Sequence, residues 1–183
     1  MTGPRIEPAQ APFEEAIEQR LRRLVPAGVE PPVLFRTLAR DPRLFERFVA
    51  GGLLDRGQLS IRQRELAILR TTARCKSAYE WGLHAVVYGA KAGLSDVQVD
   101  DTYRAAQDPA LWDDAELALF VLVDVLHETA TLTDVQWEAV RRYYSELQVL
   151  ELLMLAGFYR TVAYLTNGLA LPQEPYARTP SGA

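Results

Sequence analysis

The residues best suited to chemistry lie close together near the middle of the chain. Ser77, Glu80 and His84 follow the spacing i, i+3, i+7, which places them within about 60° on one face of a helix. Glu65 lies twelve residues before Ser77. A carboxylate and an imidazole on one face, with a second carboxylate nearby, are the groups that proton transfer requires. The pattern therefore indicates a candidate acid–base site at Glu65, Glu80 and His84.

Glu65 admits two interpretations from its position. It lies in an apolar stripe with Ile61, Ile68 and Leu69 on a helix that Ser60 opens. A carboxylate buried without a partner is costly. Glu65 is therefore either paired with a neighbouring arginine for structural reasons or is a functional acid with an adjusted pKa.

Glu80 and His84 also have structural interpretations. Ser77 and Glu80 match a capping box, which by itself would explain both residues. A helix N-terminus also stabilises a carboxylate and leaves N–H groups for an anion. His84 shares its face with Trp81, and a histidine on such a face is often a satisfied core residue. Glu80, four residues earlier, would hold the ring and raise its pKa.

Cys75 and His127 are weaker candidates. Cys75 is the one cysteine, so no intrachain disulfide can form, and a reducing cytosol is the simple interpretation. Arg74 and Lys76 flank Cys75, a setting that can lower a thiol pKa, but a buried or incidental thiol is the favoured interpretation. His127 lies late in an apolar helix, where it favours the C-terminal dipole, and we assign it no catalytic role.

The length, composition and net charge of the chain restrict the class of protein. A chain of 183 residues favours one domain, and 49% hydrophobic residues suffice for a sizeable core. A net charge of −4 argues against a dedicated nucleic-acid-binding protein. The N-terminus lacks the apolar region of a signal peptide, so we expect a cytoplasmic protein. Glu151, Arg160 and Asn167 interrupt the apolar stretch 147–171, which favours a core or subunit-interface helix over a membrane span.

The pattern between the ends of the chain is helical nearly everywhere. We expect a flexible arm over 1–11, a single all-α domain over 12–171 and a loose tail over 172–183. Asp41 and Pro42 provide an N-cap and a first residue for a helix that ends near Gly51 and Gly52. Further helices are expected over 13–25, 34–39 and 113–128.

Capping boxes of the form Ser/Thr-x-x-Glu/Gln mark five more helix starts. They are Ser60/Gln63, Ser77/Glu80, Ser95/Gln98, Thr133/Gln136 and Ser145/Gln148. Gly93 is a plausible stop for the helix that follows Ser77. With no hairpin or alternating strand pattern, the fold class expected is all-α.

The spacing also supports a family resemblance. Glu65-x11-Ser77-x2-Glu80-x3-His84, within RELAILRTTARCKSAYEWGLHAVVYGAKAGLS, resembles the carboxymuconolactone decarboxylase family, which includes the alkylhydroperoxidase D (AhpD) branch. The resemblance covers about residues 34–172. Peroxidase members have Glu-x11-Cys-x2-Cys-x3-His, whereas Ser77 and Glu80 stand at the two cysteine positions here. The chain thus looks like a non-redox member that lacks the cysteine pair.

The resemblance implies an all-α, AhpD-like bundle that assembles into a homo-oligomer, from dimer to hexamer. It implies lyase-like or isomerase-like chemistry on a small carboxylated or lactone substrate, with His84 as proton donor and Glu80 and Glu65 completing the relay. Ser77 and the adjoining helix N-terminus are candidates to bind a carboxylate or enolate oxygen. Further candidate substrate contacts are Arg70, Arg74 and Trp81.

We predict no metal site, no cofactor, no nucleic-acid partner and no membrane association. A non-catalytic small-molecule-binding or scaffold protein with the same bundle is the main alternative, and a closed site without room beside His84 would favour it. A peroxidase acting through Cys75 is a third possibility.

Overall fold

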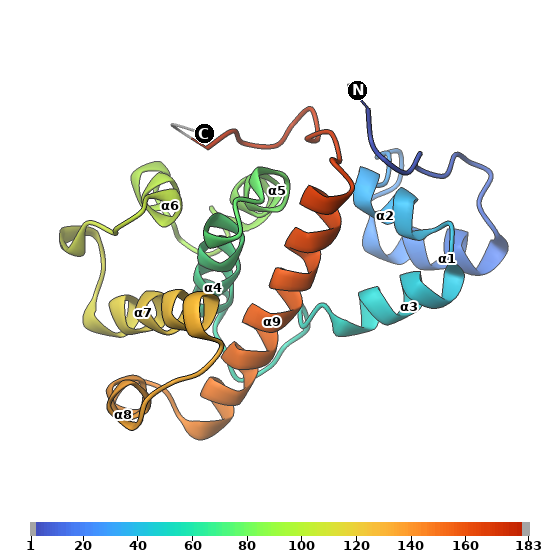
Figure 1. Ribbon diagram of the computed structural model, residues 1–183. Helices are drawn as coiled ribbons and strands as arrows, with labels where there is room; N and C mark the ends of the chain where they lie inside the picture. The colour runs from blue at the N-terminus through green and yellow to red at the C-terminus, as the bar shows by residue number, and fades with distance from the viewer. Residues whose placement is uncertain (1–2, 181–183) are drawn as a thin grey trace.

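The chain folds into a bundle of α-helices. A computed structural model describes residues 3–180, and in that part of the chain it contains nine α-helices, one short 3-10 turn and no strand, which confirms the all-α fold class (Figure 1). In chain order the elements are α1 (Glu15–Leu24), α2 (Val33–Leu38), α3 (Pro42–Gly51), α4 (Ile61–Arg74), α5 (Ala78–Tyr88), α6 (Asp96–Tyr103), η1 (Pro109–Leu111), α7 (Asp114–Thr129), α8 (Asp134–Arg141) and α9 (Glu146–Gly168).

The helix α4 forms the centre of the bundle. It packs against α5, α6, α7 and α9, and its residues from Glu65 to Ala73 are all buried. A helix that is covered on every side must be apolar nearly all round, and the polar residues within it need partners. The helices α1–α3 lie to one side of α9 and form a smaller cluster around Ile17, Leu21 and Phe45.

Most helix starts follow the caps expected from the sequence. The boxes at Ser60, Ser95, Thr133 and Ser145 are complete, and Asp41 caps α3 with Pro42 at its first position. These caps act within one turn of helix, so neighbouring residues suffice to specify them. The fifth expected box, at Ser77 and Glu80, is not complete.

The end of α5 differs from expectation. The helix stops at Tyr88 rather than near Gly93, and the chain then turns before α6. Gly89 lies too close to the preceding turn to carry a side chain, because an added Cβ would lie 2.4 Å from the carbonyl oxygen of Ala85. Gly93 takes a positive φ of 68° and ends this turn rather than the helix.

The C-terminal tail is packed, not loose, over residues 172–180. The Glu174 carboxylate is 8% exposed and accepts hydrogen bonds from the backbone of Val33 and the hydroxyl of Tyr79, both at 2.5 Å. The backbone N–H of Arg178 donates to the carbonyl of Gly82 at 3.2 Å. Since these contacts join the tail to α2 and α5, we call residues 172–180 the C-terminal strap. Residues 181–183 of the expected tail lie outside the described residues.

The N-terminal arm also contacts the bundle. The backbone N–H of Arg5 donates to the carbonyl of Leu169 at 2.8 Å, and its side chain donates to the carbonyl of Gly168 at 2.8 Å. Arg5, in the expected flexible arm, therefore has defined partners at the end of α9, and the backbone N–H of Ala9 donates to the carbonyl of Arg36 on α2 at 3.1 Å. Residues 1 and 2 lie outside the described residues.

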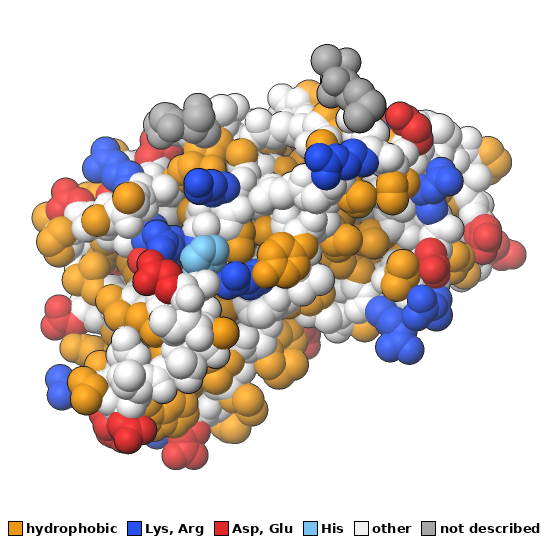
Figure 2. All heavy atoms as spheres, in the orientation of Figure 1, with side chains coloured by type: hydrophobic (Ala, Val, Ile, Leu, Met, Phe, Trp, Pro, Cys, Tyr) orange, Lys and Arg blue, Asp and Glu red, His pale blue; other side chains and the backbone are white. Residues whose placement is uncertain are grey.

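The long helix α9 is apolar along most of its length. By length and composition alone it could cross a membrane, a test that a buried core helix also meets. One face packs into the core through residues such as Leu152, Leu155 and Val162, which are at most 1% exposed. The opposite face is open. Figure 1 shows α9 crossing the front of the molecule, and Figure 2, in the same orientation, shows apolar side chains on this side between groups of charged ones.

Candidate functional site

The connection between α4 and α5 brings the two halves of the site together. The backbone N–H of Ser77 donates to the carbonyl of Thr72 at 2.9 Å, and Lys76 takes a positive φ of 54°, a conformation that often ends a helix. The chain then turns so that α5 packs against α4. Glu65, near the start of α4, thereby meets His84, near the end of α5.

His84 is the centre of a buried polar cluster. Its Nδ1 lies 2.7 Å from Glu65 Oε2, and its Nε2 lies 3.3 Å from Glu80 Oε1 and 3.2 Å from the hydroxyl of Tyr159. His84 is 4% exposed, and Glu65 is fully buried. Glu65, Glu80 and His84 therefore converge across two adjacent helices, as their spacing indicated. Their catalytic roles stay a prediction.

Glu65 has a partner on each carboxylate oxygen. Oε2 accepts from His84, and Oε1 accepts from Arg64 Nε at 3.0 Å. Arg64 also donates to the carbonyl of Leu54 at 2.9 Å. Glu65 is thus both ion-paired with a neighbouring arginine and bonded to the imidazole, so the two interpretations of this residue are compatible.

Glu80 is turned away from the helix cap. Ser77 Oγ accepts a long bond, 3.5 Å, from the Glu80 backbone N–H, but the N–H of Ser77 itself donates to Thr72. The Glu80 carboxylate faces His84 instead, and its Oε2 is buried without a hydrogen-bond partner among the described residues. Since buried polar atoms are nearly always bonded, this orphan oxygen needs an explanation, and capping does not supply it.

The two carboxylates determine the charge of His84. Burial disfavours the charged ring, but the hydrogen bonds and Coulomb attraction of Glu65 and Glu80 outweigh burial and raise the pKa of His84 to about 9. His84 is therefore an imidazolium at neutral pH, with Nδ1–H donating to Glu65. Burial, together with Glu80 and Glu65, raises the pKa of Tyr159 well above its usual value, so its hydroxyl stays protonated.

A cavity of about 340 Å³ opens beside His84. The polar side chains that line it near the ring are Glu80, Tyr88 and Tyr159, and the ring of Tyr88 stacks on that of His84 with centroids 5.1 Å apart. The other lining residues are mostly apolar and come from the connection between α1 and α2, from α2 and α3, and from α5 and α9. Tyr176, on the C-terminal strap, closes one side. There is thus room for a small molecule next to the imidazolium.

Two predicted substrate contacts on α5 do not line this cavity. Ser77 is fully buried, and its Oγ lies 2.8 Å from the Oγ1 of Thr166 on α9. Trp81 is also fully buried, and its Nε1 donates to Thr102 at 2.9 Å on the α6 side of the helix. Both side chains tie α5 to its neighbours, so neither contacts a molecule held beside His84.

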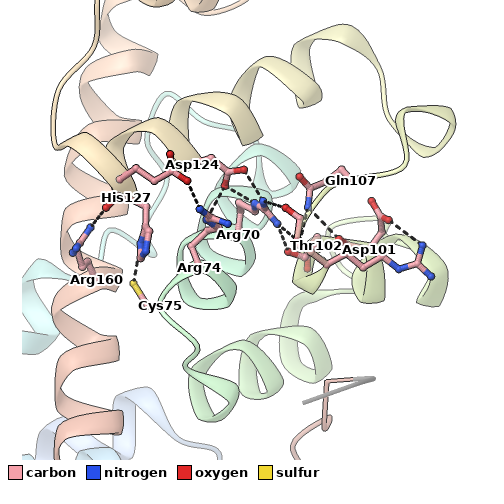
Figure 3. A network of polar contacts seen from close by, with 12 residues as sticks. Arg70, Arg74, Cys75, Asp101, Thr102, Gln107, Asp124, His127 and Arg160 are labelled. Atoms are coloured by element: carbon pink, nitrogen blue, oxygen red, sulfur yellow. Dashed lines mark hydrogen bonds and ion pairs between the residues drawn. The ribbon is translucent and has the colours of Figure 1, made fainter.

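The predicted contacts Arg70 and Arg74 lie in a different network, shown in Figure 3. Arg70 is fully buried and donates two bonds, of 2.6 and 2.5 Å, to the carboxylate of Asp124 on α7. It also donates to three backbone carbonyls at the end of α6 and just after it, which use up its donors. Arg74 pairs with Glu128 at 2.6 Å. Both arginines therefore join α4 to α7 and do not line the cavity beside His84.

Cys75 belongs to this second network as well. Its Sγ lies 3.7 Å from His127 Nδ1, next to another hollow of about 380 Å³ between α7 and α9 (Figure 3). Burial raises the pKa of the thiol, although Arg160 and Arg74 act in the opposite direction. This direction agrees with the interpretation of Cys75 as a buried or incidental thiol, because desolvation outweighs the arginines.

Sequence reasoning missed Tyr159; it placed Tyr88 on the face of His84 without a role, and it expected an arginine beside Glu65 without naming Arg64. Tyr159 lies on the buried stripe of α9, seventy-five residues from His84. A tyrosine on an otherwise apolar buried stripe needs a partner for its hydroxyl, and this signal was present. The sequence did not show which partner the tyrosine would have.

No group of three or more His, Cys, Asp or Glu side chains in residues 3–180 is arranged to hold a metal ion. The expectation that the protein needs no cofactor stays a prediction.

Comparisons with known proteins show the fold. No protein-family model and no curated protein matches the sequence. Among solved structures, an uncharacterized peroxidase-related protein from Silicibacter sp. TM1040 aligns over 96% of both chains, with a TM-score of 0.78 and 15% identity. An AhpD-core, peroxidase-related protein from Ralstonia eutropha JMP134 aligns over 93% of both chains, with a TM-score of 0.74 and 17% identity.

A third similar structure is the debrominase Bmp8 in complex with 2,3,4-tribromopyrrole. It aligns over 93% of this chain and 92% of its own, with a TM-score of 0.71 and 14% identity. At such low identities the similarity establishes the fold, which is AhpD-like, as the resemblance implied. It does not establish the decarboxylase branch or an activity.

Proposed function

We propose that this protein is an enzyme that catalyses proton transfer on a small molecule bound in the cavity beside His84. The observation that carries the proposal is the His84 ring held between two carboxylates at the wall of a cavity large enough for a substrate. General acid–base catalysis needs a donor and an acceptor within hydrogen-bond reach of the reacting atoms, and such a pair contributes about 10²–10⁴-fold in rate.

In this mechanism His84 is the acid and Glu80 is the base. Glu80 takes a proton from the substrate carbon next to a carbonyl, and His84 Nε2–H donates a proton to the resulting enolate. Glu65 holds Nδ1–H and keeps the ring charged and oriented. Tyr159 and Tyr88 position the ring from either side. The proton on Glu80 then passes to His84 Nε2, 3.3 Å away, which restores both groups, so the net reaction is an isomerisation or, where this proton first exchanges with water, an exchange with solvent.

A decarboxylation of the kind that the family resemblance implies would use the same last step. Loss of CO2 leaves an enolate, and protonation at carbon by His84 completes the reaction. The two versions differ in whether the substrate carries a carboxylate when it enters the cavity. The room beside His84 argues against a scaffold protein with a closed site. The raised pKa of Cys75, and its place outside the cavity, argue against a thiol peroxidase.

The test is deuterium exchange into substrate. A panel of enolisable cyclic ketones and lactones is incubated in D2O with the protein, and loss of the exchanging proton is followed by NMR. We expect His84→Gln to slow exchange by about 10²-fold or more. His127→Gln is the matched control, because His127 lies in the other hollow. Exchange that is absent from the parent, or equal in parent and His84→Gln, would refute the proposal. A protein that binds these molecules without exchange would be the binding protein of the alternative.

A further inference from the structure

The cavity beside His84 is unusual in the charges that it lacks. Among the described residues that line it, none is Lys or Arg, and the charged ones are Glu80 and His84. Arg64, the nearest arginine of the cluster, donates to Glu65 and to the carbonyl of Leu54 and does not line the cavity. The cation on the cavity wall, His84, is already paired with Glu65 and Glu80, so a carboxylated ligand would lose its hydration without gaining an unpaired cation, which is costly.

A cationic guest is not favoured either. The Glu65 and Glu80 carboxylates face the His84 imidazolium and the Arg64 guanidinium within hydrogen-bond or ion-pair distance. The charges of these four groups cancel, so the cluster as a whole attracts neither sign strongly. An uncharged ligand avoids the desolvation cost that a carboxylated or a cationic ligand would incur.

The entrance to the cavity is apolar as well. Four of the large apolar or aromatic side chains that are exposed on this protein lie among the lining residues: Leu24, Val29, Leu54 and Tyr176, each between 40% and 48% exposed. They come from three separate segments, namely the end of α1 with the loop after it, the loop after α3, and the C-terminal strap. A gathering of exposed apolar groups around a cavity marks a site for an apolar ligand.

The polar groups gather at the opposite end. Glu80, Tyr88 and Tyr159 each contact the imidazole ring of His84. Glu80 Oε2 is buried and unpartnered among the described residues, so the cluster retains the capacity to accept one hydrogen bond. A ligand with one small polar group would place that group here and its apolar remainder toward the mouth.

We infer that the substrate is an uncharged, largely apolar molecule of one or two rings with a single hydroxyl or carbonyl group, which it presents to His84 and Glu80. This inference rests on the proposed function, because the bound molecule is a substrate only if the protein is an enzyme. It replaces the carboxylated substrate that the resemblance implied. The size is consistent, since a cavity of about 150 Å³ holds one benzene ring and this one measures about 340 Å³. The bromopyrrole bound by the debrominase of the same fold is also a small ring compound.

The test uses three probes that share a 4-methylphenyl ring and differ in charge, with a readout that needs no turnover. Binding of 4-methylphenol, 4-methylbenzoate and 4-methylbenzylamine to the full chain is measured by isothermal titration calorimetry at pH 7. We expect 4-methylphenol to bind at least about tenfold more tightly than either charged probe, because each ion must be desolvated. Val87→Lys places a cation on the cavity wall and should improve binding of 4-methylbenzoate relative to 4-methylphenol.

Matched variants locate the binding site. Leu83→Trp fills the cavity beside His84 and should abolish binding of 4-methylphenol, whereas Leu153→Trp, in the other hollow, should leave it unchanged. The inference is overturned if a charged probe binds as tightly as 4-methylphenol, if no probe binds, or if Leu83→Trp has no effect.

The outcomes of the two proposals are separable. Selective binding of 4-methylphenol by a protein that exchanges no deuterium would refute the catalysis and leave the ligand class standing. Rapid exchange into a carboxylated lactone, lost in His84→Gln, would support the catalysis and refute the ligand class.

Discussion

At the scale of single residues, the neighbours of His84 decide its chemistry. An isolated histidine is mostly neutral at pH 7, and burial alone would make it more so. Two carboxylates reverse this outcome, because each accepts a hydrogen bond from the charged ring or attracts it within 3.3 Å. The same imidazole in an apolar core without Glu65 and Glu80 would be a poor proton donor.

The raised pKa of His84 predicts a pH dependence of stability. Its folded pKa is about 9 and its unfolded value about 6.5, so its stabilising contribution is fully present below pH 6.5 and is lost as the pH rises through 9. We expect the free energy of unfolding of the parent, relative to His84→Gln, to fall by roughly 2–3 kcal/mol across this window. Tyr88 and Tyr159, which face His84, have pKa values raised above 10 and do not titrate within the window.

The measurement is urea denaturation at several pH values between 6 and 10, with the His84 ring titration followed by NMR. His127→Gln is the control. Burial, with Arg160 and Arg74, lowers the pKa of His127. The free energy of unfolding therefore depends on His127 only as the pH falls below 6.5. An NMR pKa for His84 below 7, or a parent–variant difference that does not change with pH, would contradict the analysis.

At the scale of the elements, the C-terminal strap completes the cavity. It carries Tyr176 into the cavity wall and is anchored by Glu174, whose carboxylate satisfies the first backbone N–H of α2 and the hydroxyl of Tyr79 on α5. Arg178 adds ion pairs with Asp96 and Asp100 near the start of α6. The strap therefore holds α2 and α5 together over the site.

Removal of the anchor should destabilise the protein. Glu174→Ala leaves the Val33 N–H and the Tyr79 hydroxyl without their partner, and each buried unsatisfied group costs about 1–3 kcal/mol. We expect a loss of about 2–4 kcal/mol in the free energy of unfolding, measured by urea denaturation. Glu138→Ala, at an exposed position on α8, is the matched control and should change stability by less than about 0.5 kcal/mol. An equal effect of the two substitutions would show that the strap does not anchor the fold.

At the scale of the whole molecule, the open face of α9 calls for a partner. Exposed residues recur along it at spacings of three and four: Leu147, Leu150, Met154, Gly157, Thr161 and Tyr164. Four of these side chains are large and are 56–62% exposed. Such a seven-residue repeat is typical of a helix that packs against another helix. We propose that this face joins copies of the chain in a homo-oligomer.

This proposal predicts a mass and a variant that lowers it. Light scattering at micromolar concentration should give at least twice the chain mass of 20.5 kDa. Met154→Glu places a charge in the centre of the stripe and should shift the mass to that of one chain, because a buried unpaired charge destabilises an interface. Val97→Glu, on α6, also adds a charge at an exposed valine and should leave the mass unchanged. A parent that already sediments and scatters as a 20.5 kDa species would refute the proposal.

The sequence by itself determined the helical fold class, most helix starts and the shared helix face of Glu80 and His84, whereas the meeting of Glu65 with His84 was a prediction that needed the packing of α4 against α5. The caps at Ser60, Ser95, Thr133 and Ser145 involve residues three apart, so local geometry decides them. The periodicity of the α-helix likewise places Glu80 and His84 on one face before any packing is known.

Only the tertiary structure decided what those residues contact. Glu80 has the same sequence context as a capping residue, but a buried imidazole on the next turn draws its carboxylate away from the cap. Arg70 was a reasonable candidate for substrate binding until α7 brought Asp124 against it, and Tyr159 reaches His84 because α9 packs beside α5. Partners on different helices depend on how those helices are rotated and shifted against each other. That arrangement follows from the packing of the entire core, and no short stretch of sequence contains it.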